Sequence, residues 1–264
     1  MKLVRPKKFL GQHFLTDLDV ARAIADTVDA CPNIPILEVG PGMGVLTQYL
    51  INKERPLKVV ELDDESVEYL RRAYPALEEE IVEDDFLKMR LDRLFGGEPF
   101  VLTGNYPYNI SSQIFFKMLE YKDLIPCCTG MIQKEVAQRV AAPPGGKTYG
   151  ILSVLLQAWY HVEYLFTVGS EVFDPPPKVQ SAVVRMTRND VSELGCDERL
   201  FKTVVKTTFN QRRKTLRNSI KPILGQGCPL TEDKLFDRRP EQLSVAEFVD
   251  LTNRVEEALK KQEA

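Results

Sequence analysis

Four short motifs place glycine or polar residues where a strand-like apolar run ends. They are EVGPGMG at 38–44, VVELD at 59–63, EDDF at 83–86 and GNYPY at 104–108. Glycines at 40, 42 and 44 would let the backbone pass close to a ligand. A carboxylate at Glu61 can accept hydrogen bonds from the two hydroxyls of a ribose, and Asp85 can accept one from an adenine amino group. Together with Asn105, these residues indicate a nucleotide-like site.

Each of these residues also has a purely structural explanation. Glu61 and Asp85 could cap the helices that follow them, while Asn105 and Pro107 are common in turns. The glycine spacing is G-x-G-x-G rather than the G-x-G-x-x-G of dinucleotide sites, so the glycines alone decide little. Candidate groups at four strand ends favour a site, because parallel sheets bind ligands outside the carboxyl ends of their strands.

The elements that would position these residues alternate between strand and helix. Strand-like runs lie at 34–40, 57–62, 79–85, 99–104, 127–133, 162–168 and 181–187. Helix-like runs lie at 45–54, 63–74, 111–121, 134–142 and 151–160. An earlier helix is expected from its cap at Thr16, with Asp19 reaching back. The alternation predicts a mostly parallel α/β sheet with helices on both faces, and the two consecutive late strands predict an antiparallel strand at its edge.

The composition changes over residues 188–198, and the chain beyond reads as helical. We therefore expect two domains, 1–188 around the sheet and 189–264 as a small all-helical C-terminal domain. A break in the first of these helices is expected near Asn210, because the later apolar residues leave its apolar face. The last helix should begin at Ser244, where Glu247 would complete a capping box.

Composition excludes several classes of protein. No apolar stretch among the 264 residues is long enough to span a bilayer, and the basic N-terminus has no apolar run typical of a secretory signal. The five cysteines show no metal-ligand spacing, and only two histidines are present, so no metal site is expected. We interpret all five cysteines as reduced, which favours a cytoplasmic protein.

The net charge of −3 hides a strong asymmetry. Four basic residues precede the first acidic one, Asp17, and the segment 202–221 holds seven basic residues and no acidic one. Such local patches matter more than the total charge for a polyanionic partner such as RNA. A charged run is more often a solvated surface, so this observation alone does not establish RNA binding.

The four strand-end motifs, in this order, resemble Class I S-adenosylmethionine-dependent methyltransferases. Four further stretches narrow the resemblance to the rRNA adenine N6-dimethyltransferase family: KKFLGQHFL at 7–15, QKEVAQR at 133–139, FDPPPKVQSAVV at 173–184 and FNQRRKTLRN at 209–218. The resemblance covers essentially the whole chain. It implies a Rossmann-like sheet with a helical appendage. It also implies transfer of methyl groups to N6 of two adjacent adenosines near the 3′ end of small-subunit (16S) rRNA, giving N6,N6-dimethyladenosine during ribosome biogenesis.

The resemblance implies S-adenosylmethionine as cofactor and a set of residues to hold it. This set is His13, Leu15, Gly40, Gly42, Gly44, Glu61, Asp85 and Asn105. His13 departs from the family pattern, which often has asparagine at this position. Whether His13 would contact the cofactor through its side chain or its backbone stays open.

The NYPY element is expected to present the target base. An adenine amino group is a poor nucleophile, because its lone pair is delocalised into the ring. The side-chain oxygen of Asn105 and the backbone carbonyl of Tyr106 would accept its hydrogens, and Pro107 would fix the turn. Tyr108 would stack on the base, and Phe173 resembles the family's second stacking residue, although it could equally be a core phenylalanine.

Basic residues in several segments are expected to contact RNA phosphates. They are Lys7, Lys8, Lys178, Arg212, Arg213, Lys214 and Arg217. The expected partner is small-subunit rRNA or an immature 30S particle, bound by a monomer and without a membrane. Such backbone contacts would position RNA without reading its sequence.

Three other functions remain open from sequence. A related enzyme could methylate 23S rRNA adenine and confer antibiotic resistance, although the FNQRRKTLRN segment favours the small subunit. The protein could act mainly as an RNA-binding factor in ribosome assembly, a role that an enzyme could also have. A small-molecule methyltransferase is disfavoured by the basic appendage.

Overall fold

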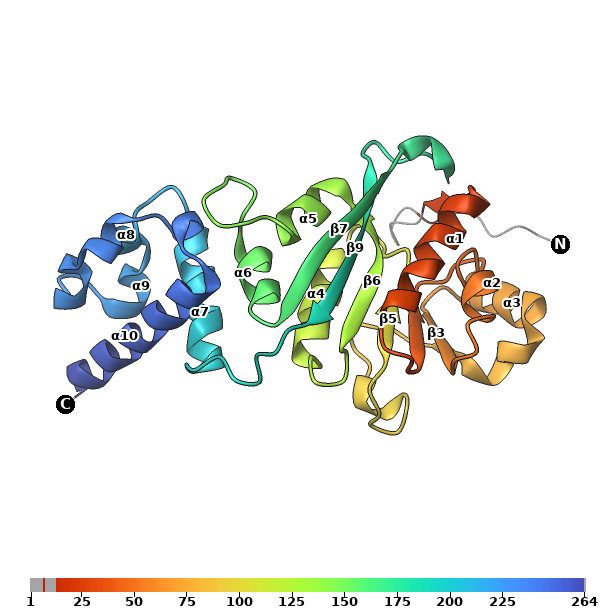
Figure 1. The fold of residues 1–264 in the computed structure, drawn as a ribbon, viewed down its shortest axis with the longest axis horizontal. Coiled ribbons are helices and arrows are strands. Elements are labelled where there is room, and N and C mark those ends of the chain that lie inside the picture. The colour runs from red at the N-terminus through yellow and green to blue at the C-terminus, as the bar shows by residue number, and fades with distance from the viewer. Residues whose placement is uncertain (1–6, 8–12, 264) are drawn as a thin grey trace. The chain divides into compact units, whose positions relative to one another are not determined.

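The structure, a computed structural model, describes residues 7 and 13–263 (Figure 1). The chain divides into two compact units. The sheet unit comprises 1–137 and 161–188, and the helical unit comprises 138–160 and 189–264. The change at 188/189 coincides with the expected domain boundary, while residues 138–160 group with the C-terminal helices. The domain limits 1–188 and 189–264 therefore stay a prediction.

A seven-stranded sheet has the order β4-β3-β2-β5-β6-β9-β7 (Figure 1). Its strands are β2 Ile36–Val39, β3 Leu57–Glu61, β4 Ile81–Glu83, β5 Val101–Thr103, β6 Cys127–Gln133, β7 Tyr160–Val168 and β9 Ser181–Arg188. In this order, the five strands β4, β3, β2, β5 and β6 each pair in parallel with the next, and β6 pairs antiparallel with β9. The mostly parallel sheet is therefore confirmed, and its antiparallel strand, β9, lies between β6 and the edge strand β7 rather than at the edge itself.

The helices of the sheet unit alternate with these strands. They are α1 Leu18–Asp26, α2 Thr47–Leu50, α3 Asp64–Ala73, α4 Ser111–Glu120 and the start of α5 Lys134–Val140. Successive residues of β6 point to opposite faces of the sheet. Cys127 packs into the core that contains Ile24 of α1, whereas Cys128 touches Tyr106, whose ring packs edge-on against Phe115 of α4. Helices therefore cover both faces, as expected.

The start of α1 differs from the expected one. The helix begins at Leu18, and the N-cap is Asp17, whose carboxylate accepts from the backbone amides of Asp19 and Val20. The hydroxyl of Thr16 instead donates to the carbonyl of Val172. The prediction of Thr16 as the cap was wrong because a contact with a distant loop engages this side chain.

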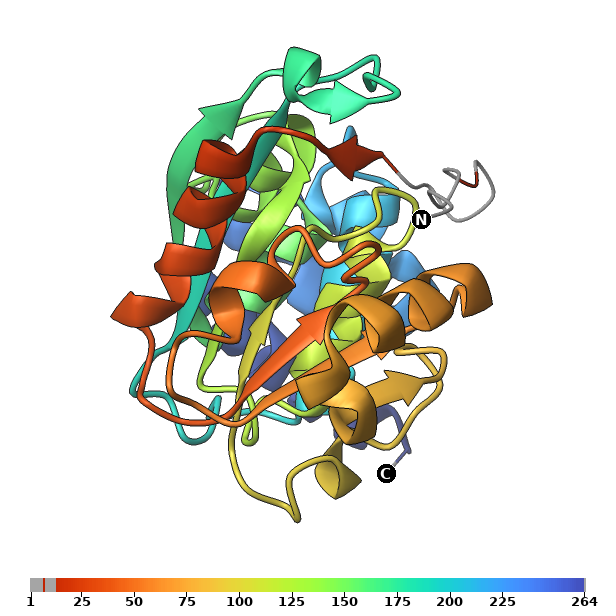
Figure 2. The same ribbon diagram turned by 90° about the vertical axis from the view of Figure 1, so that its right-hand side faces the viewer.

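A short two-stranded sheet lies beside the main one. It pairs β1 Phe14–Leu15 antiparallel with β8 Phe173–Asp174, seen in Figure 2 as the dark red and light green arrows. This pairing joins the beginning of the described chain to the segment before β9. It brings His13, directly before β1, to the region of the expected site.

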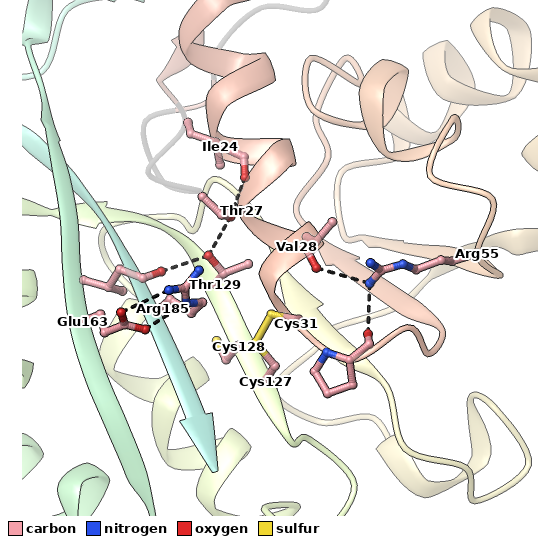
Figure 3. The surroundings of a disulfide bond; sticks show 12 residues. Ile24, Thr27, Val28, Cys31, Arg55, Cys127, Cys128, Thr129, Glu163 and Arg185 are labelled. Atoms are coloured by element: carbon pink, nitrogen blue, oxygen red, sulfur yellow. Dashed lines mark hydrogen bonds and ion pairs between the residues drawn. A yellow bond between two sulfur atoms is a disulfide. The ribbon is translucent and has the colours of Figure 1, made fainter. Parts of the chain in front are cut away.

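Two of the five cysteines form a disulfide, which corrects the prediction that all are reduced. Cys31 follows the short helix after α1, Cys127 begins β6, and their Cα atoms lie 5.8 Å apart (Figure 3). Their separation of 96 residues gives no local signal in the sequence. Cys128, Cys196 and Cys228 are free thiols. Reduced cysteines therefore no longer support a cytoplasmic location.

The helical unit contains α6 Ile151–Gln157, α7 Glu198–Asn210, α8 Leu216–Ser219, α9 Lys221–Leu224 and α10 Val245–Glu263. The expected break after Asn210 is confirmed, because α7 ends at this residue. The expected capping box is also confirmed: the amide of Ser244 donates to the carboxylate of Glu247, and the amide of Glu247 donates to the hydroxyl of Ser244. Phe209 of α7 stacks on Phe248 of α10, with ring centroids 5.8 Å apart.

Candidate functional site

A cavity of about 220 Å³ lies at the carboxyl ends of the parallel strands. Its lining includes most of the residues expected at the cofactor and the base: His13, Leu15, Gly40, Gly42, Glu61, Asp85, Asn105, Tyr106, Pro107 and Tyr108. Gly44 and Phe173 are not among the lining residues. The order of strands therefore gathers side chains from β1 to the end of β5 around one space.

The glycine loop after β2 needs its glycines for two different reasons. Gly40, Gly42 and Gly44 have φ values of +67°, +56° and +79°, a region that disfavours side chains. A Cβ on Gly42 would also lie 3.3 Å from the ring of Phe14. A Cβ on Gly44 would lie only 2.4 Å from the ring of Tyr74, so this glycine serves packing outside the cavity.

Glu61 ties the end of β3 to the glycine loop. One carboxylate oxygen accepts from the amide of Gly42 at 3.0 Å, and the other accepts from those of Leu62 and Asp63 at 2.9 Å. Burial raises the pKa of Glu61, although these amides oppose the rise. A carboxylate has about four acceptor positions, and the three amides use three of them, so one position remains for a ribose hydroxyl. Glu61 therefore both shapes the cavity and offers it an acceptor.

Asp85 has a similar double role. Its carboxylate accepts from the amide of Leu87 at 3.0 Å and pairs with the exposed Lys88 at 3.1 Å. These contacts close the turn that follows β4. The cap-like role considered from sequence and a place on the cavity wall therefore occur together.

Glu38 is a site residue that the sequence analysis did not single out. It lies on β2, is 1% exposed, lines the cavity and accepts from the hydroxyl of Thr47 at 2.7 Å. Burial raises the pKa of Glu38 to about 8, and the neighbouring charge of Glu61 adds to this rise. An acidic residue in the middle of an apolar strand was the signal that could have revealed it.

The buried Glu38 side chain should make the free energy of unfolding depend on pH. The folded chain holds the Glu38 proton up to a pKa of about 8, whereas the unfolded chain releases it near 4.5. Glu38 should therefore make the free energy of unfolding fall as pH rises from about 4.5 to 8. Urea unfolding across this range should show a flatter decline for Glu38→Gln than for the wild type. The exposed Glu83→Gln serves as control, and parallel curves for Glu38→Gln and the wild type would contradict the expected titration.

Tyr106 anchors the NYPY element in the core. Its side chain is 1% exposed, and its hydroxyl donates to the carbonyl of Thr129 at 2.9 Å. Its amide donates to the carbonyl of Met131, and the amide of Met131 donates to the carbonyl of Gly104, both at 3.0 Å. A Cβ on Gly130 would lie 2.7 Å from the Tyr106 ring, which explains the glycine within β6.

This anchoring leaves two acceptors at the cavity. Among residues 7 and 13–263, the side-chain amide of Asn105 and the carbonyl of Tyr106 have no hydrogen-bond partner. Both residues line the cavity. The motif therefore presents the pair of acceptors that an amino group with two hydrogens requires.

Phe173 has a different environment from the rest of the expected site. It is 4% exposed, lies opposite Leu15 in the β1–β8 pair and belongs to the apolar core of the sheet unit. This position matches the core phenylalanine considered from sequence. A stacking role for Phe173 stays a prediction.

Removing the Phe173 ring should destabilise the fold. Phe173→Ala should lower the free energy of unfolding by about 3–5 kcal/mol, because it leaves a cavity in a packed core. Denaturant unfolding would measure the loss, with the equally buried Phe100→Ala as control. A stacking role requires that Phe173→Ala, unlike Phe100→Ala, also accumulates monomethyladenosine. Equal ratios of monomethylated to dimethylated product in the two variants would remove Phe173 from the site.

The basic residues expected to bind RNA fall into both units. Lys7 pairs with Asp63 and, at 3.3 Å, with Glu65, while Lys8 lies outside the described residues. Lys178 is exposed in the sheet unit. In the helical unit, exposed Arg213 and Lys214 lie in the turn after α7.

The other two arginines of this segment have partners within the helical unit. The guanidinium of Arg212 lies 6.0 Å from the centre of the Phe209 ring. Arg217 pairs with Asp237 at 2.7 Å. Exposed Arg213 and Lys214 are therefore the more available cations for a polyanion.

Two classes of feature are absent from the described part of the chain. No helix there is both long and apolar enough to cross a membrane. No group of three or more His, Cys, Asp or Glu residues within 7 and 13–263 could hold a metal ion.

Comparisons with known sequences agree on one family. The family model described as "Ribosomal RNA adenine dimethylase" matches residues 4–257. The "Ribosomal RNA small subunit methyltransferase A" of Bacteroides thetaiotaomicron is 79% identical over 260 residues, which cover 98% of this chain and 97% of the relative. The protein of the same name from Porphyromonas gingivalis is 59% identical over 253 residues, covering 96% and 98%.

Solved structures share the fold. A dimethyladenosine transferase from Plasmodium falciparum matches with a TM-score of 0.77 at 22% identity, covering 93% of this chain and 98% of that one. The 23S rRNA methyltransferase ErmE matches with a TM-score of 0.65 at 25% identity, covering 92% and 99%.

Proposed function

The chain belongs to the ribosomal RNA adenine dimethylase family, and we propose that it methylates N6 of two adjacent adenosines near the 3′ end of small-subunit (16S) rRNA. The observation that carries this proposal is the cavity that joins the glycine loop and Glu61 to the acceptors of Asn105 and Tyr106. The names of the relatives support the small subunit. The product would be N6,N6-dimethyladenosine.

The family and the fold imply S-adenosylmethionine as cofactor, and the cavity residues fit this molecule. Gly40 and Gly42 give a backbone surface without side chains, and Glu61 and Asp85 offer acceptors for ribose hydroxyls and an adenine amino group. Leu62 lines the same cavity and is 51% exposed, so a ligand ring that packs on it would bury apolar surface. When bound, S-adenosylmethionine supplies a methyl group on a sulfonium centre.

The residues of the NYPY element would prepare the target amine. The Asn105 side-chain oxygen and the Tyr106 carbonyl would each accept one amino hydrogen, which orients the nitrogen lone pair. Tyr108 would hold the extruded base by stacking. No general base is required beforehand, because the nitrogen becomes acidic once it carries the added methyl group. Catalysis by this chain would then be positioning and hydrogen bonding.

The second transfer places a different demand on the same residues. The monomethylated amine has one hydrogen, so Asn105 and the Tyr106 carbonyl cannot both accept one. The first methyl group must also fit where a hydrogen was. We therefore expect stacking on Tyr108 to carry more of the positioning in the second step.

The basic turn after α7 is the part of the chain that we assign to RNA backbone contacts. Replacing Arg212, Arg213 and Lys214 together with alanine should weaken binding to ribosomal particles. The plot of log affinity against log salt should also become less steep, with a slope smaller in magnitude by roughly 2–3. S-adenosylmethionine affinity should stay unchanged. Filter binding between 50 and 200 mM salt would measure the slope, since each lost phosphate contact removes about 0.7–0.9 from it.

The control for this prediction removes three positive charges elsewhere. Lys234, Lys260 and Lys261 are exposed lysines of the helical unit outside the basic turn. Their triple alanine variant should keep most of the salt slope. Equal losses in the two variants would mean that net charge, rather than this turn, governs RNA binding.

Methyl transfer to the two ribosomal subunits tests the choice of substrate. The likeness to ErmE favours 23S rRNA as the second candidate. Labelled methyl groups should enter undermethylated small-subunit particles and not large-subunit RNA. Incorporation only into large-subunit RNA would overturn the proposal.

We also propose that the protein acts as a monomer in the cytoplasm on an immature 30S particle, where an additional assembly role is compatible with catalysis.

A further inference from the structure

Tyr108 is held from outside its own motif. Its hydroxyl forms a hydrogen bond with the hydroxyl of Ser181, the first residue of β9. The ring of His13 stacks on the Tyr108 ring, with centroids 5.6 Å apart and planes inclined by 29°. Ser181 is fully buried, whereas Tyr108 is partly exposed at the cavity. One end of the tyrosine is therefore fixed in the interior while its ring remains at the cavity wall.

Ser181 has a fixed position because β9 is tied to β6. It lies opposite Gln133 in the antiparallel ladder. Next to it, Gln180 accepts the amide of Lys134 at 2.9 Å and the Lys134 side chain at 2.8 Å. The serine hydroxyl therefore stands at a defined place at the end of β6.

The same strand also fixes Asn105. Met131 of β6 exchanges backbone hydrogen bonds with Gly104 and Tyr106, on either side of Asn105. Met131 and Gln133 are two residues apart on one strand. Strand β6 thus sets the position of the amide acceptor at one point and, through Ser181, the position of the Tyr108 hydroxyl at the other.

The Tyr108 hydroxyl needs this partner. Burial raises the pKa of Tyr108, so its hydroxyl stays protonated, and a buried hydroxyl without a partner is unfavourable. His13 covers one face of the ring and is itself placed by its Nδ1–H, which donates to the carbonyl of Pro175 at 2.8 Å. The other face is the one on which a base could stack.

We propose that Ser181 is a positioning residue for methyl transfer, which fixes the tilt of the Tyr108 ring relative to Asn105. The claim rests on the proposed function, because it treats Tyr108 as the platform for the target adenine. Ser181 itself does not touch the base. Its effect passes entirely through the Tyr108 hydroxyl.

A double-mutant cycle tests this dependence. Ser181→Ala and Tyr108→Phe should each lower kcat by about tenfold, as expected when one positioning hydrogen bond is lost. The double variant should be no slower than the slower single variant, because both remove the same bond. The affinity for S-adenosylmethionine, measured by calorimetry, should be unchanged. Ser153→Ala, which removes a buried serine hydroxyl of the helical unit bonded to the Arg139 carbonyl, should keep wild-type kcat.

A wild-type kcat in Ser181→Ala, or losses that multiply in the double variant, would overturn the inference. Ring signals of ¹³C-tyrosine in NMR, with Tyr108 assigned through Tyr108→Phe, give a readout that does not need the reaction. Slow ring rotation in the wild type and fast rotation in Ser181→Ala would support the fixed ring. If the wild type fails to methylate rRNA but shows this difference, the proposed function fails and the fixed ring stands. Fast rotation in both proteins would remove the positioning role.

Discussion

Asn105→Ala should lower the rate of methyl transfer by roughly 100-fold, the size of effect seen when one preorganised hydrogen-bonding group is lost from an active site. The side-chain amide has no partner within the described residues, so its removal breaks no bond that holds the fold. The backbone bridge between Asn105 and Met131 does not involve the side chain and remains. The loss should appear in kcat, because the amide acts on the reacting amine rather than on RNA binding.

Single-turnover transfer of labelled methyl groups, with saturating cofactor and RNA particles, would measure this rate. Binding of the particles and thermal unfolding should match the wild type. Asn52→Ala provides a control in the sheet unit, since it removes an exposed amide that donates to the carbonyl of Gln48. A rate within twofold of the wild type for Asn105→Ala would contradict the role of this amide.

Glu61→Ala should weaken S-adenosylmethionine binding by roughly 100-fold. The hydrogen bond to a ribose hydroxyl is lost, and a hydrogen bond to a charged group is worth about 1.5–3 kcal/mol. The structure adds a second cause, because Glu61 also holds the amides of Gly42, Leu62 and Asp63 in place. Glu61→Gln keeps the shape and one acceptor oxygen, so its loss of affinity should be intermediate.

Isothermal titration calorimetry with S-adenosylmethionine would measure both variants. Glu83→Ala is the matched control, since Glu83 lies opposite Glu61 in the β3–β4 pairing but pairs with Arg71 outside the cavity. Its affinity should stay at the wild-type value. A folded Glu61→Ala protein that binds the cofactor as tightly as Glu83→Ala would exclude Glu61 from the cofactor site.

Much of the site could be predicted from sequence because its geometry follows from local rules. Apolar runs that end in Gly40, Glu61 and Asn105 place these residues at the same edge of a parallel sheet, whatever the details of packing. The break after Asn210 and the capping box at Ser244 are likewise short-range features. Each depends on residues only a few positions apart.

Several features that the sequence did not reveal depend on long-range contacts. Thr16 does not cap α1 because it bonds to Val172, 156 positions away. Cys31 meets Cys127 only when α1 and the short helix after it lie beside β6. Phe173 is drawn into the core by its pairing with Leu15. No local pattern in the sequence reveals these contacts.

The central claim is that this chain dimethylates adenosines of small-subunit rRNA. The direct measurement incubates purified wild-type protein with undermethylated small subunits and labelled S-adenosylmethionine, digests the RNA and identifies the modified nucleosides by mass spectrometry. We expect N6,N6-dimethyladenosine at two adjacent positions near the 3′ end, and almost none with Asn105→Ala. Label confined to another nucleoside, or no label in RNA although the protein binds the cofactor, would contradict the claim.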